Sequence, residues 1–366
     1  SSAASDVYKR QGGMVLFILL IVLIASLTSG GIKSYSQLED KLVNAAEKYY
    51  KDNSDKLPLT DGTVSVTDST LVEGNYIKEL SKLYSKDKCT ATVEVVKNGD
   101  DYLYNPILKC DNYNTKTLYS ELTQNVVTSD SGLYSVGNEY IFKGEYINNY
   151  VKFDGKTWRI VKIDDNGIKM YLINEKLEKA VWDDRYNLEK ETEYGKNVYD
   201  TSRISVYLKE MYEKDSVVSA KLKKYLVDAT WCVDSIKEGT LISNINLCGK
   251  TMKSHIGLLN VDDYAKASLE STCKHFDDPQ CVNYNYMNEL GGTNWTLNAY
   301  SENTYDVYAI DENGIYYYKA SKENEIRPVI YLNSHLTVSS GDGSENEPYV
   351  IKSVSYTHLT LPTSDL

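Results

Sequence analysis

The sequence predicts an α+β protein: a hydrophobic N-terminal helix, a small α+β membrane-proximal domain, and then a larger α+β domain. Three observations carry this prediction. A charge-free apolar run fills residues 14–27, an amphipathic helix followed by a β-hairpin fills 36–109, and strands lie at both ends of 132–353 with helical segments between them. Strands at both ends favour α+β over a doubly wound sheet, in which strands and helices alternate.

The two ends of the chain carry a sequence that we expect to be foreign to the protein. One back-translation of residues 1–11, SSAASDVYKRQ, has a reverse complement that encodes VSYTHLTLPT, the sequence of residues 354–363. This DNA resembles the primer and transposase end used in sequencing libraries. We therefore assign 1–11 and 354–366 to adaptor and expect the natural sequence to run from Gly12 to about Ser353.

The composition bounds the class of protein. Without the adaptor-like ends, about 342 residues remain, enough for two domains that each bury a core. The formal net charge is −12, and an acidic chain is poorly suited to phosphate backbones, so we expect no nucleic-acid partner. Tyrosine (33) far outnumbers phenylalanine (4), which suits half-exposed strands and contact surfaces.

The apolar run MVLFILLIVLIASL (14–27) predicts export. Fourteen residues match the apolar core of a signal peptide, whereas about twenty span a bilayer as a helix. Against cleavage, Ala25-Ser26-Leu27 lacks the small residue that a cleavage site needs. We expect 12–31 to be an uncleaved anchor that contacts the membrane through 14–29, with a cleaved signal segment as the alternative. Both interpretations place the bulk of the chain outside the cell, and the first gives a single-pass membrane protein.

An amphipathic helix is predicted after this segment. Ser36-x-x-Glu39 has the form of a capping box. The apolar residues that then share one helical face are Leu38, Leu42, Ala45, Ala46 and Tyr49. Together with LVNAAEKYYKDN (42–53), the pattern resembles type IV pilins and pseudopilins, which implies a minor pilin-like structural subunit. The pilin leader and its Phe-Thr-Leu-Ile-Glu start are absent, so a plain anchor with a stalk helix is the alternative.

Residues 32–110 predict a small helix-plus-hairpin domain, with a short helix near Ser69–Leu83 and a linker at 111–131. In the hairpin, Asn98-Gly99 is a turn signal between two alternating segments. If residue 97 faces 102, Cys89 faces Cys110, at about 4.5 Å between Cα atoms for a non-hydrogen-bonded pair. We predict that disulfide.

The other four cysteines leave more alternatives open, because six cysteines allow many pairings. Locality favours Cys232–Cys248 and Cys273–Cys281. No CxxC spacing supports a zinc site. A free thiol would need an activating histidine, and His255, His275 and His335 lie in no recognisable motif.

The larger domain is predicted from two hairpins and a last strand. The hairpins are 157–163 with 168–173, in which Trp158 and Ile160 point inward, and 307–310 with 315–318; Pro328–Leu332 is the last strand. Two helices are predicted between them. Their apolar faces are Ile204, Leu208, Met211 and Tyr212 in the first, and Val218, Leu222, Tyr225 and Leu226 in the second.

Six segments of this domain carry a family resemblance: FDGKTWRIVKID (153–164), IGLLNVDDYAKAS (256–268), GGTNWTLNAY (291–300), DVYAIDENGIYYY (306–318), IRPVIYLN (326–333) and GDGSENEPYVI (341–351). In this order they resemble uncharacterised domains of bacterial surface and prepilin-like proteins. Those domains are related to the formylglycine-generating-enzyme branch of C-type-lectin-like folds. The resemblance implies a compact lectin-like domain over 132–353, with its chain ends close together.

The resemblance carries no activity over to this chain. Formylglycine enzymes hold copper with a cysteine pair that no cysteine here matches, so we predict no enzyme and no cofactor. The Glu-Pro-Asn and Gln-Pro-Asp calcium motifs are also absent. Calcium at Asp164–Gly167, at Asp311–Gly314 or in the similar turn at 342–345 is the alternative to plain turns.

A candidate ligand surface is predicted from aromatic residues: Trp295, Tyr300, Tyr305 and Tyr308, with Tyr316 and Tyr318 nearby. We expect Trp295 to be core and Tyr300 and Tyr305 to offer contacts, and Arg327 to pair with a carboxylate. The Asn/Tyr-rich stretch 283–318 resembles regions diversified by adenine-targeted mutagenesis. We predict a membrane-anchored extracellular binding or adhesion protein of a bacterial surface, with an unknown glycan or protein as ligand. An unrecognised extracellular enzyme is a further alternative to the pilin-like subunit.

Overall fold

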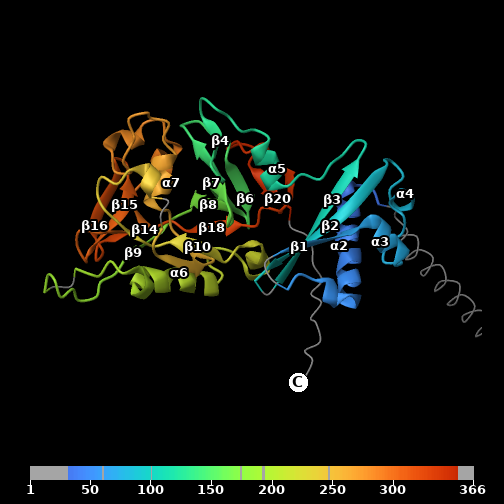
Figure 1. Cartoon of the computed structure of the whole chain (residues 1–366), viewed down its shortest axis with the longest axis horizontal. Coiled ribbons are helices and arrows are strands. Elements are labelled where there is room, and N and C mark those ends of the chain that lie inside the picture. The colour runs from blue at the N-terminus through green and yellow to red at the C-terminus, as the bar shows by residue number, and fades with distance from the viewer. Residues whose placement is uncertain are drawn as a thin grey trace, which may run out of the picture.

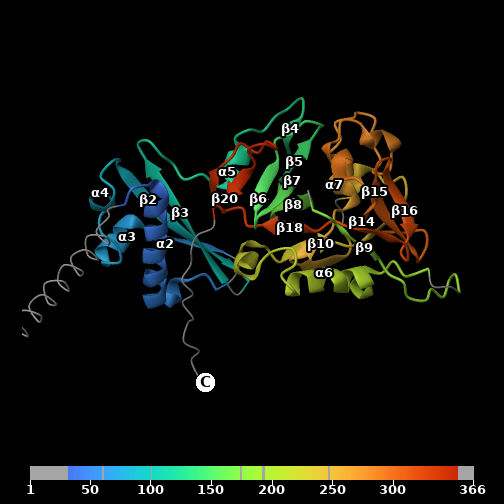
Figure 2. The same ribbon diagram turned by 180° about the vertical axis from the view of Figure 1, so that it is seen from behind.

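The computed structural model describes residues 32–352, except 60–61, 100, 174, 192–193 and 246–247. The apolar run and both adaptor-like ends lie outside the described residues. Within the described part, no helix is long and apolar enough to cross a membrane. The chain forms two side-by-side parts, a small domain with α2 and β1–β3 and a large domain that holds the remaining sheets (Figure 1 and, from behind, Figure 2).

The small domain begins with the predicted amphipathic helix, α2 (Tyr35–Asp52). Its N-cap is Ser34, whose hydroxyl accepts a hydrogen bond from the backbone N–H of Gln37, so the capping box predicted at Ser36 is wrong. The predicted face is buried, except that Tyr50 rather than Tyr49 is fully covered. Ser34 caps because its extended backbone aims its hydroxyl at the first free N–H groups.

The helix packs against a three-stranded sheet in the order β1-β2-β3 (Thr63–Thr67, Cys89–Asn98, Asp101–Cys110). The predicted hairpin register is confirmed: Lys97 faces Tyr102, and Cys89 faces Cys110. A short 3₁₀ turn, η1 (Ser54–Lys56), follows α2. Two short helices, α3 (Asp68–Glu73) and α4 (Leu80–Leu83), replace the predicted single one, because Asn75 has φ +59° and interrupts it.

The stretch predicted as a linker, 111–131, contains a helix of the large core. This is α5 (Leu118–Thr123), whose Leu118 and Leu122 are buried in that core. The backbone N–H of Leu118 donates to the carbonyl of Leu336 at 2.8 Å, and Thr117 bridges Thr337. Polar composition predicted a linker, but two spaced leucines and a capped start at Thr117 were enough to dock this helix.

The large domain is built on two principal sheets. The nine-stranded sheet runs β13-β18-β8-β7-β6-β20-β19, with β5 also on β7 and β4 on β5. Its strands are β4 (Gly132–Val136), β5 (Glu139–Lys143), β6 (Tyr150–Phe153), β7 (Lys156–Asp164), β8 (Gly167–Ile173), β13 (Ile256–Gly257), β18 (Val329–Leu332), β19 (Val338–Ser340) and β20 (Tyr349–Ile351).

The six-stranded sheet runs β16-β15-β14-β17-β9, with β11 on β14. Its strands are β9 (Glu178–Val181), β11 (Ser235–Ile236), β14 (Asn294–Tyr300), β15 (Asp306–Asp311), β16 (Gly314–Lys319) and β17 (Glu323–Ile326). A separate ribbon pairs β10 (Ala229–Cys232) with β12 (Thr251–Ser254). β14–β16 lie at the end of the molecule opposite the small domain (Figures 1 and 2).

Helical segments connect these strands: α6 (Arg203–Glu213), α7 (Val261–Lys266), η2 (Tyr199–Thr201), η3 (Ala220–Tyr225), η4 (Ile242–Asn244), η5 (Pro279–Val282) and η6 (Tyr286–Leu290). Both predicted hairpins are confirmed, with Asp164 opposite Gly167 and Asp311 opposite Gly314. The first predicted helix is α6. The second is the 3₁₀ helix η3, because Leu222 and Tyr225 are buried three residues apart, which matches three residues per turn.

Three tryptophans, Trp158, Trp182 and Trp295, lie fully inside the large core, and each indole N–H donates to a backbone carbonyl. Buried indoles need such partners. Arg327 is also buried, but the prediction that it pairs with a carboxylate is wrong. Its guanidinium donates to Asn294 Oδ1 (3.0 Å) and to two backbone carbonyls, and these neutral oxygens satisfy its donors in place of a carboxylate.

The two domains are joined by a buried ionic contact as well as by α5. Glu39 on α2 is 2% exposed, and its Oε2 lies 2.5 Å from Lys352 Nζ, just beyond β20. The other carboxylate oxygen, Oε1, accepts hydrogen bonds from Tyr113 and Thr115. Val96 and Leu103 of the small sheet belong to the large core. The domains therefore share packed surface.

Replacing Lys352 by methionine is expected to lower the free energy of unfolding by about 3 kcal/mol, because it leaves the buried Glu39 carboxylate without its cation. Urea denaturation followed by circular dichroism measures the loss. The control is Lys82→Met, which breaks the exposed Lys82–Glu79 pair and should change stability by less than about 0.5 kcal/mol. Equal effects of the two substitutions would contradict the importance of the Glu39 contact.

Candidate functional site

The three predicted disulfides are confirmed: Cys89–Cys110, Cys232–Cys248 and Cys273–Cys281. No cysteine of the described chain is free, which rules out a thiol nucleophile in this oxidised form. The Cys232–Cys248 bridge closes the segment that contains β11, and the Cys273–Cys281 bridge closes the loop that leads into η5. Both bridges therefore fix irregular backbone near one end of β14.

Of the predicted ligand surface, Trp295 and Tyr308 are each only 1% exposed, so neither contributes to a surface. The expectation of core for Trp295 is confirmed, and the assignment of Tyr308 to a ligand surface is wrong. Tyr308 is covered by Phe276, whose ring centroid lies 5.1 Å away edge-on, and its hydroxyl donates to the carbonyl of Ile236. The loop between Cys273 and Cys281 supplies this cover.

Tyr300 is half-buried and stacks on a second tyrosine, Tyr317, with ring centroids 4.3 Å apart and planes inclined by 20°. Tyr317 faces Tyr308 across β15 and β16, so the three rings come from adjacent strands. Tyr317 is 43% exposed. Tyr317 is not among the residues predicted for the ligand surface; the signal available in the sequence was its register opposite Tyr308 in the predicted hairpin.

Tyr300 also lines an open hollow of about 510 Å³. We call this the acidic hollow, and its lining residues are Lys237, Glu238, Gly239, His275, Asp277, Asp278, Tyr300 and Glu302. Four carboxylates and one lysine give it a formal charge of −3 with histidine neutral. The sequence did not group these residues, because they come from three segments between 237 and 302.

Backbone contacts hold the carboxylates of the acidic hollow in place. Asp277 Oδ2 accepts the N–H of Gly239 at 2.9 Å. Asp278 Oδ2 accepts the N–H groups of Lys274 and His275 at 2.8 and 2.7 Å. Burial raises the pKa of Asp278, but these backbone donors outweigh burial and leave the pKa lowered, so this carboxylate is ionised at neutral pH.

The hydroxyl of Tyr300 also contacts a carboxylate of the acidic hollow. Tyr300 Oη donates to Glu238 Oε2 at 3.3 Å. Partial burial, followed by the negative charge of Glu238, raises the pKa of Tyr300, so its phenol stays neutral. Among the other lining residues, Lys237 Nζ lies 3.6 Å from Glu302 Oε1. One lysine therefore offsets only part of the negative charge.

Tyr305 lies away from the acidic hollow. Its ring is near Tyr194, and the ammonium of Lys190 lies 5.1 Å from its centroid. Asn197 Nδ2 donates to the carbonyls of Tyr300, Asn303 and Asp306 and so fixes the loop between β14 and β15. The structure thus separates Tyr305 from Tyr300, although the sequence placed them five residues apart.

The acidic turns considered for calcium serve as hairpin turns. Asp164 accepts from Asn166 N–H and Tyr331 Oη, Asp311 accepts from Asn313 N–H and Tyr318 Oη, and Asp342 accepts from Ser344 N–H. Among the described residues, the two groups with the spacing of metal ligands each contain a disulfide pair beside one aspartate. Disulfide sulfurs are not thiolate ligands, so these groups do not fit a metal ion.

Comparisons of the chain with models of protein families, with curated proteins and with solved structures found no match. The resemblance to the formylglycine-enzyme branch of lectin-like folds therefore stays a prediction. What the described residues establish is an α+β chain with three disulfides and, at one end, an acidic hollow beside a tyrosine stack.

Proposed function

We propose that this chain is an extracellular binding or adhesion protein, anchored to a bacterial membrane through residues 14–29. We propose further that its acidic hollow binds a ligand with a cationic amine or guanidinium group. The single observation that supports this best is the meeting of four carboxylates with the aromatic ring of Tyr300 in one open hollow. Carboxylates attract a cation, and the face of a tyrosine ring binds it through its quadrupole.

The scaffold suits recognition better than catalysis. Tyr300, Tyr308 and Tyr317 stand on neighbouring strands, and a disulfide fixes the loop that carries Asp277 and Asp278. A rigid, preformed site loses little conformational entropy when a ligand binds. The three strands also lie opposite the small domain (Figure 1), which under the proposed anchoring would present the hollow away from the membrane.

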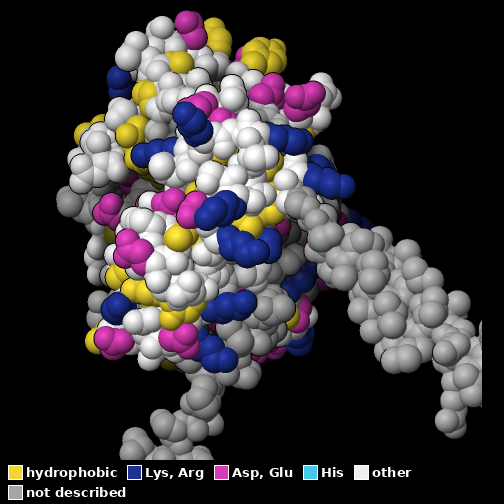
Figure 3. All heavy atoms as spheres, turned by 90° about the vertical axis from the view of Figure 1, so that its right-hand side faces the viewer, with side chains coloured by type: hydrophobic (Ala, Val, Ile, Leu, Met, Phe, Trp, Pro, Cys, Tyr) yellow, Lys and Arg dark blue, Asp and Glu magenta, His cyan; other side chains and the backbone are white. Residues whose placement is uncertain are grey.

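The charge distribution supports the choice of a cationic ligand over nucleic acid. The whole chain carries a net charge of −12. At the small-domain end, Lys and Arg side chains are interspersed with Asp and Glu rather than gathered into a stripe (Figure 3). A nucleic-acid interface needs a basic stripe.

The test is a binding titration of the full chain against lysine- and arginine-rich peptides and against chitosan oligosaccharides, with acetylated chitin oligosaccharides as the uncharged counterpart. We expect binding to one cationic source, weaker at high salt because the exposed charges are screened. We expect no change on adding calcium. Equal binding of charged and uncharged probes, or no binding to any probe, would overturn the proposed ligand class.

Replacing Tyr300 by alanine should weaken that binding about tenfold, since the aromatic ring and the hydrogen bond from its hydroxyl to Glu238 are both lost. Glu238→Gln should weaken it severalfold through charge alone. The matched control is Tyr316→Ala, which removes a tyrosine that is 45% exposed on β16 but does not line the hollow. An equal loss with the control variant would show that general surface aromaticity, not the hollow, binds the ligand.

A minor pilin-like structural subunit is the second candidate. Its support is the small domain, in which an amphipathic helix of 18 residues packs along an antiparallel sheet. The native upstream sequence distinguishes the two proposals. A basic leader that ends in glycine before a Phe-Thr-Leu-Ile-Glu start would favour the pilin-like role.

A further inference from the structure

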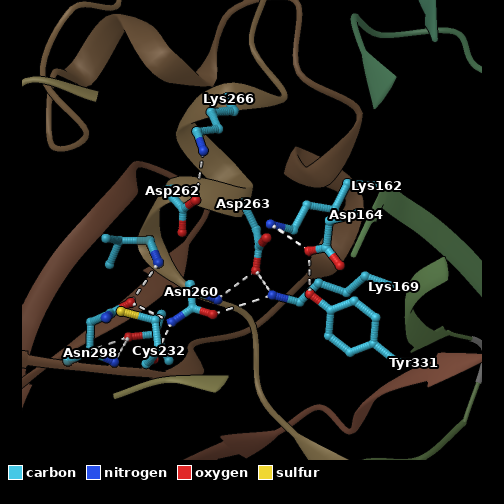
Figure 4. A network of polar contacts seen from close by, with 12 residues as sticks. Lys162, Asp164, Lys169, Cys232, Asn260, Asp262, Asp263, Lys266, Asn298 and Tyr331 are labelled. Atoms are coloured by element: carbon cyan, nitrogen blue, oxygen red, sulfur yellow. Dashed lines mark hydrogen bonds and ion pairs between the residues drawn. The ribbon is translucent and has the colours of Figure 1, made fainter. Parts of the chain in front are cut away.

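A buried polar network joins the nine-stranded sheet to the start of α7 (Figure 4). Lys169 on β8 is 2% exposed, and Asp263 and Asn260 at the start of α7 are 3% and 5% exposed. Lys169 Nζ donates to Asp263 Oδ2 at 2.6 Å and to Asn260 Oδ1 at 3.2 Å. A nucleophilic amine, a side-chain amide and a carboxyl group therefore meet away from water.

The surroundings of Lys169 are aromatic. The rings of Trp231 and Tyr331, both 3% exposed, have centroids 5.2 and 5.8 Å from its Nζ. Burial raises the pKa of Asp263, and its Oδ1 is buried without a hydrogen-bond partner. An unpartnered buried oxygen is costly for a carboxylate and much less so for a neutral acid. The site therefore favours moving a proton onto Asp263.

We propose that Lys169 and Asn260 join spontaneously through an intramolecular amide bond, with Asp263 as the proton-transfer group. Lys169 Nζ passes a proton to the Asp263 carboxylate, and the neutral amine attacks Cγ of Asn260. The bond from Nζ to Cγ forms and the bond from Cγ to Nδ2 breaks. Of the two protons that Nζ loses, one is passed on to Nδ2, which leaves as ammonia, and the other stays on Asp263 as a neutral carboxylic acid. No oxidant, reductant or other reactant is needed.

The contacts of Asn260 select it as the acyl group. Its Nδ2 donates to the carbonyl of Cys232 (2.7 Å) and to Asn298 Oδ1 (3.1 Å), while its Oδ1 faces Lys169. The amide is thus held with its oxygen toward the amine and its leaving nitrogen toward two acceptors. Holding reactants together in a dry site replaces an encounter in solution. Asp263 Oδ2 accepts from the amine and also from the backbone N–H of Asn260 at 2.7 Å, so it is placed to take a proton from Lys169 next to the amide.

A second, largely buried lysine in the same network provides an internal comparison. Lys162 Nζ lies 3.1 Å from Glu139 Oε1 and 3.0 Å from Asp164 Oδ2. Its ion-pair partners are carboxylates, which resist attack by an amine when ionised, and no side-chain amide among the described residues accepts from it. Lys162 should therefore remain a free amine.

Intact-mass measurement of the full chain, with its disulfides reduced, tests the proposal. We expect the protein to be lighter than its sequence by one ammonia molecule. After trypsin digestion, peptide 163–176, uncleaved at Lys169, should be joined to peptide 254–266. Neither peptide contains cysteine, so disulfides do not confuse the result. Asp263→Asn and Lys169→Arg should restore the full mass, and Lys162→Arg should keep the loss.

Three results would overturn the proposal. The first is a wild-type chain of full mass with two separate peptides. The second is a loss of one water molecule located at Asp263, which would make Asp263 the acyl group. The third is a loss of ammonia with the peptides still separate, as a succinimide at Asn166-Gly167 would give. Because the wild-type chain is measured directly, the test does not depend on whether the variants fold.

Discussion

Replacing Trp158 by alanine is expected to lower the free energy of unfolding by about 4 kcal/mol. Trp158 has no exposed surface and lies in β7, opposite Val151 on β6 and Leu172 on β8. Truncation removes a large apolar surface and leaves a cavity in the centre of the nine-stranded sheet. It also leaves the carbonyl of Phe153 without the indole N–H that donates to it, which adds to the cost.

Guanidinium denaturation followed by far-ultraviolet circular dichroism measures this change without relying on tryptophan fluorescence. Tyr146→Ala is the matched control, because this aromatic residue is 84% exposed and its truncation should change stability by less than about 0.5 kcal/mol. A loss below about 1 kcal/mol for Trp158→Ala would mean that β7 is not the centre of the core.

Removing the Cys89–Cys110 bridge by a double serine substitution should cost about 3 kcal/mol. The bridge joins residues separated by 21 positions, so the unfolded chain gains the entropy of an open loop when it is lost. The bridge also ties the two ends of the β2–β3 hairpin, against which α2 packs. Thermal denaturation, with hydrogen exchange at β2 and β3, measures the effect.

The Cys273–Cys281 bridge offers a comparison of a different kind. It closes a loop with a separation of only 8, so its removal should cost less stability than removal of the first bridge. Removal of the Cys273–Cys281 bridge should instead weaken ligand binding, because the loop that it closes carries Asp277 and Asp278.

If removal of the Cys89–Cys110 bridge left the melting temperature unchanged, the small domain would owe its stability to α2 packing alone.

The features that depend on neighbouring residues could be predicted from the sequence. Alternation and an Asn-Gly turn gave the register of β2 with β3, and that register alone paired Cys89 with Cys110. The same rules located the β7–β8 and β15–β16 hairpins and placed Trp158 inside. In each case the turn brings together residues that are close along the chain, so local backbone geometry fixes the outcome.

Burial in β14 and α5 was decided by tertiary structure. All but the last residue of β14 are buried on both faces, so no alternation could separate Trp295 from Tyr300. Tyr308 is covered by Phe276 from a disulfide-closed loop, and α5 is held by the carbonyl of Leu336, more than two hundred positions away. Whether such side chains face water depends on distant segments that a local pattern does not contain.

For the same reason, neither of the two proposed sites could be predicted from the sequence. The acidic hollow combines residues from 237 to 302, and the amine of Lys169 reaches Asn260 across 91 positions. Composition predicted an acidic, tyrosine-rich exported chain, and local patterns predicted its hairpins and disulfides. Only the packing of α7 against β8, and of the disulfide-closed loop against β14, brought the chemically active groups within contact distance.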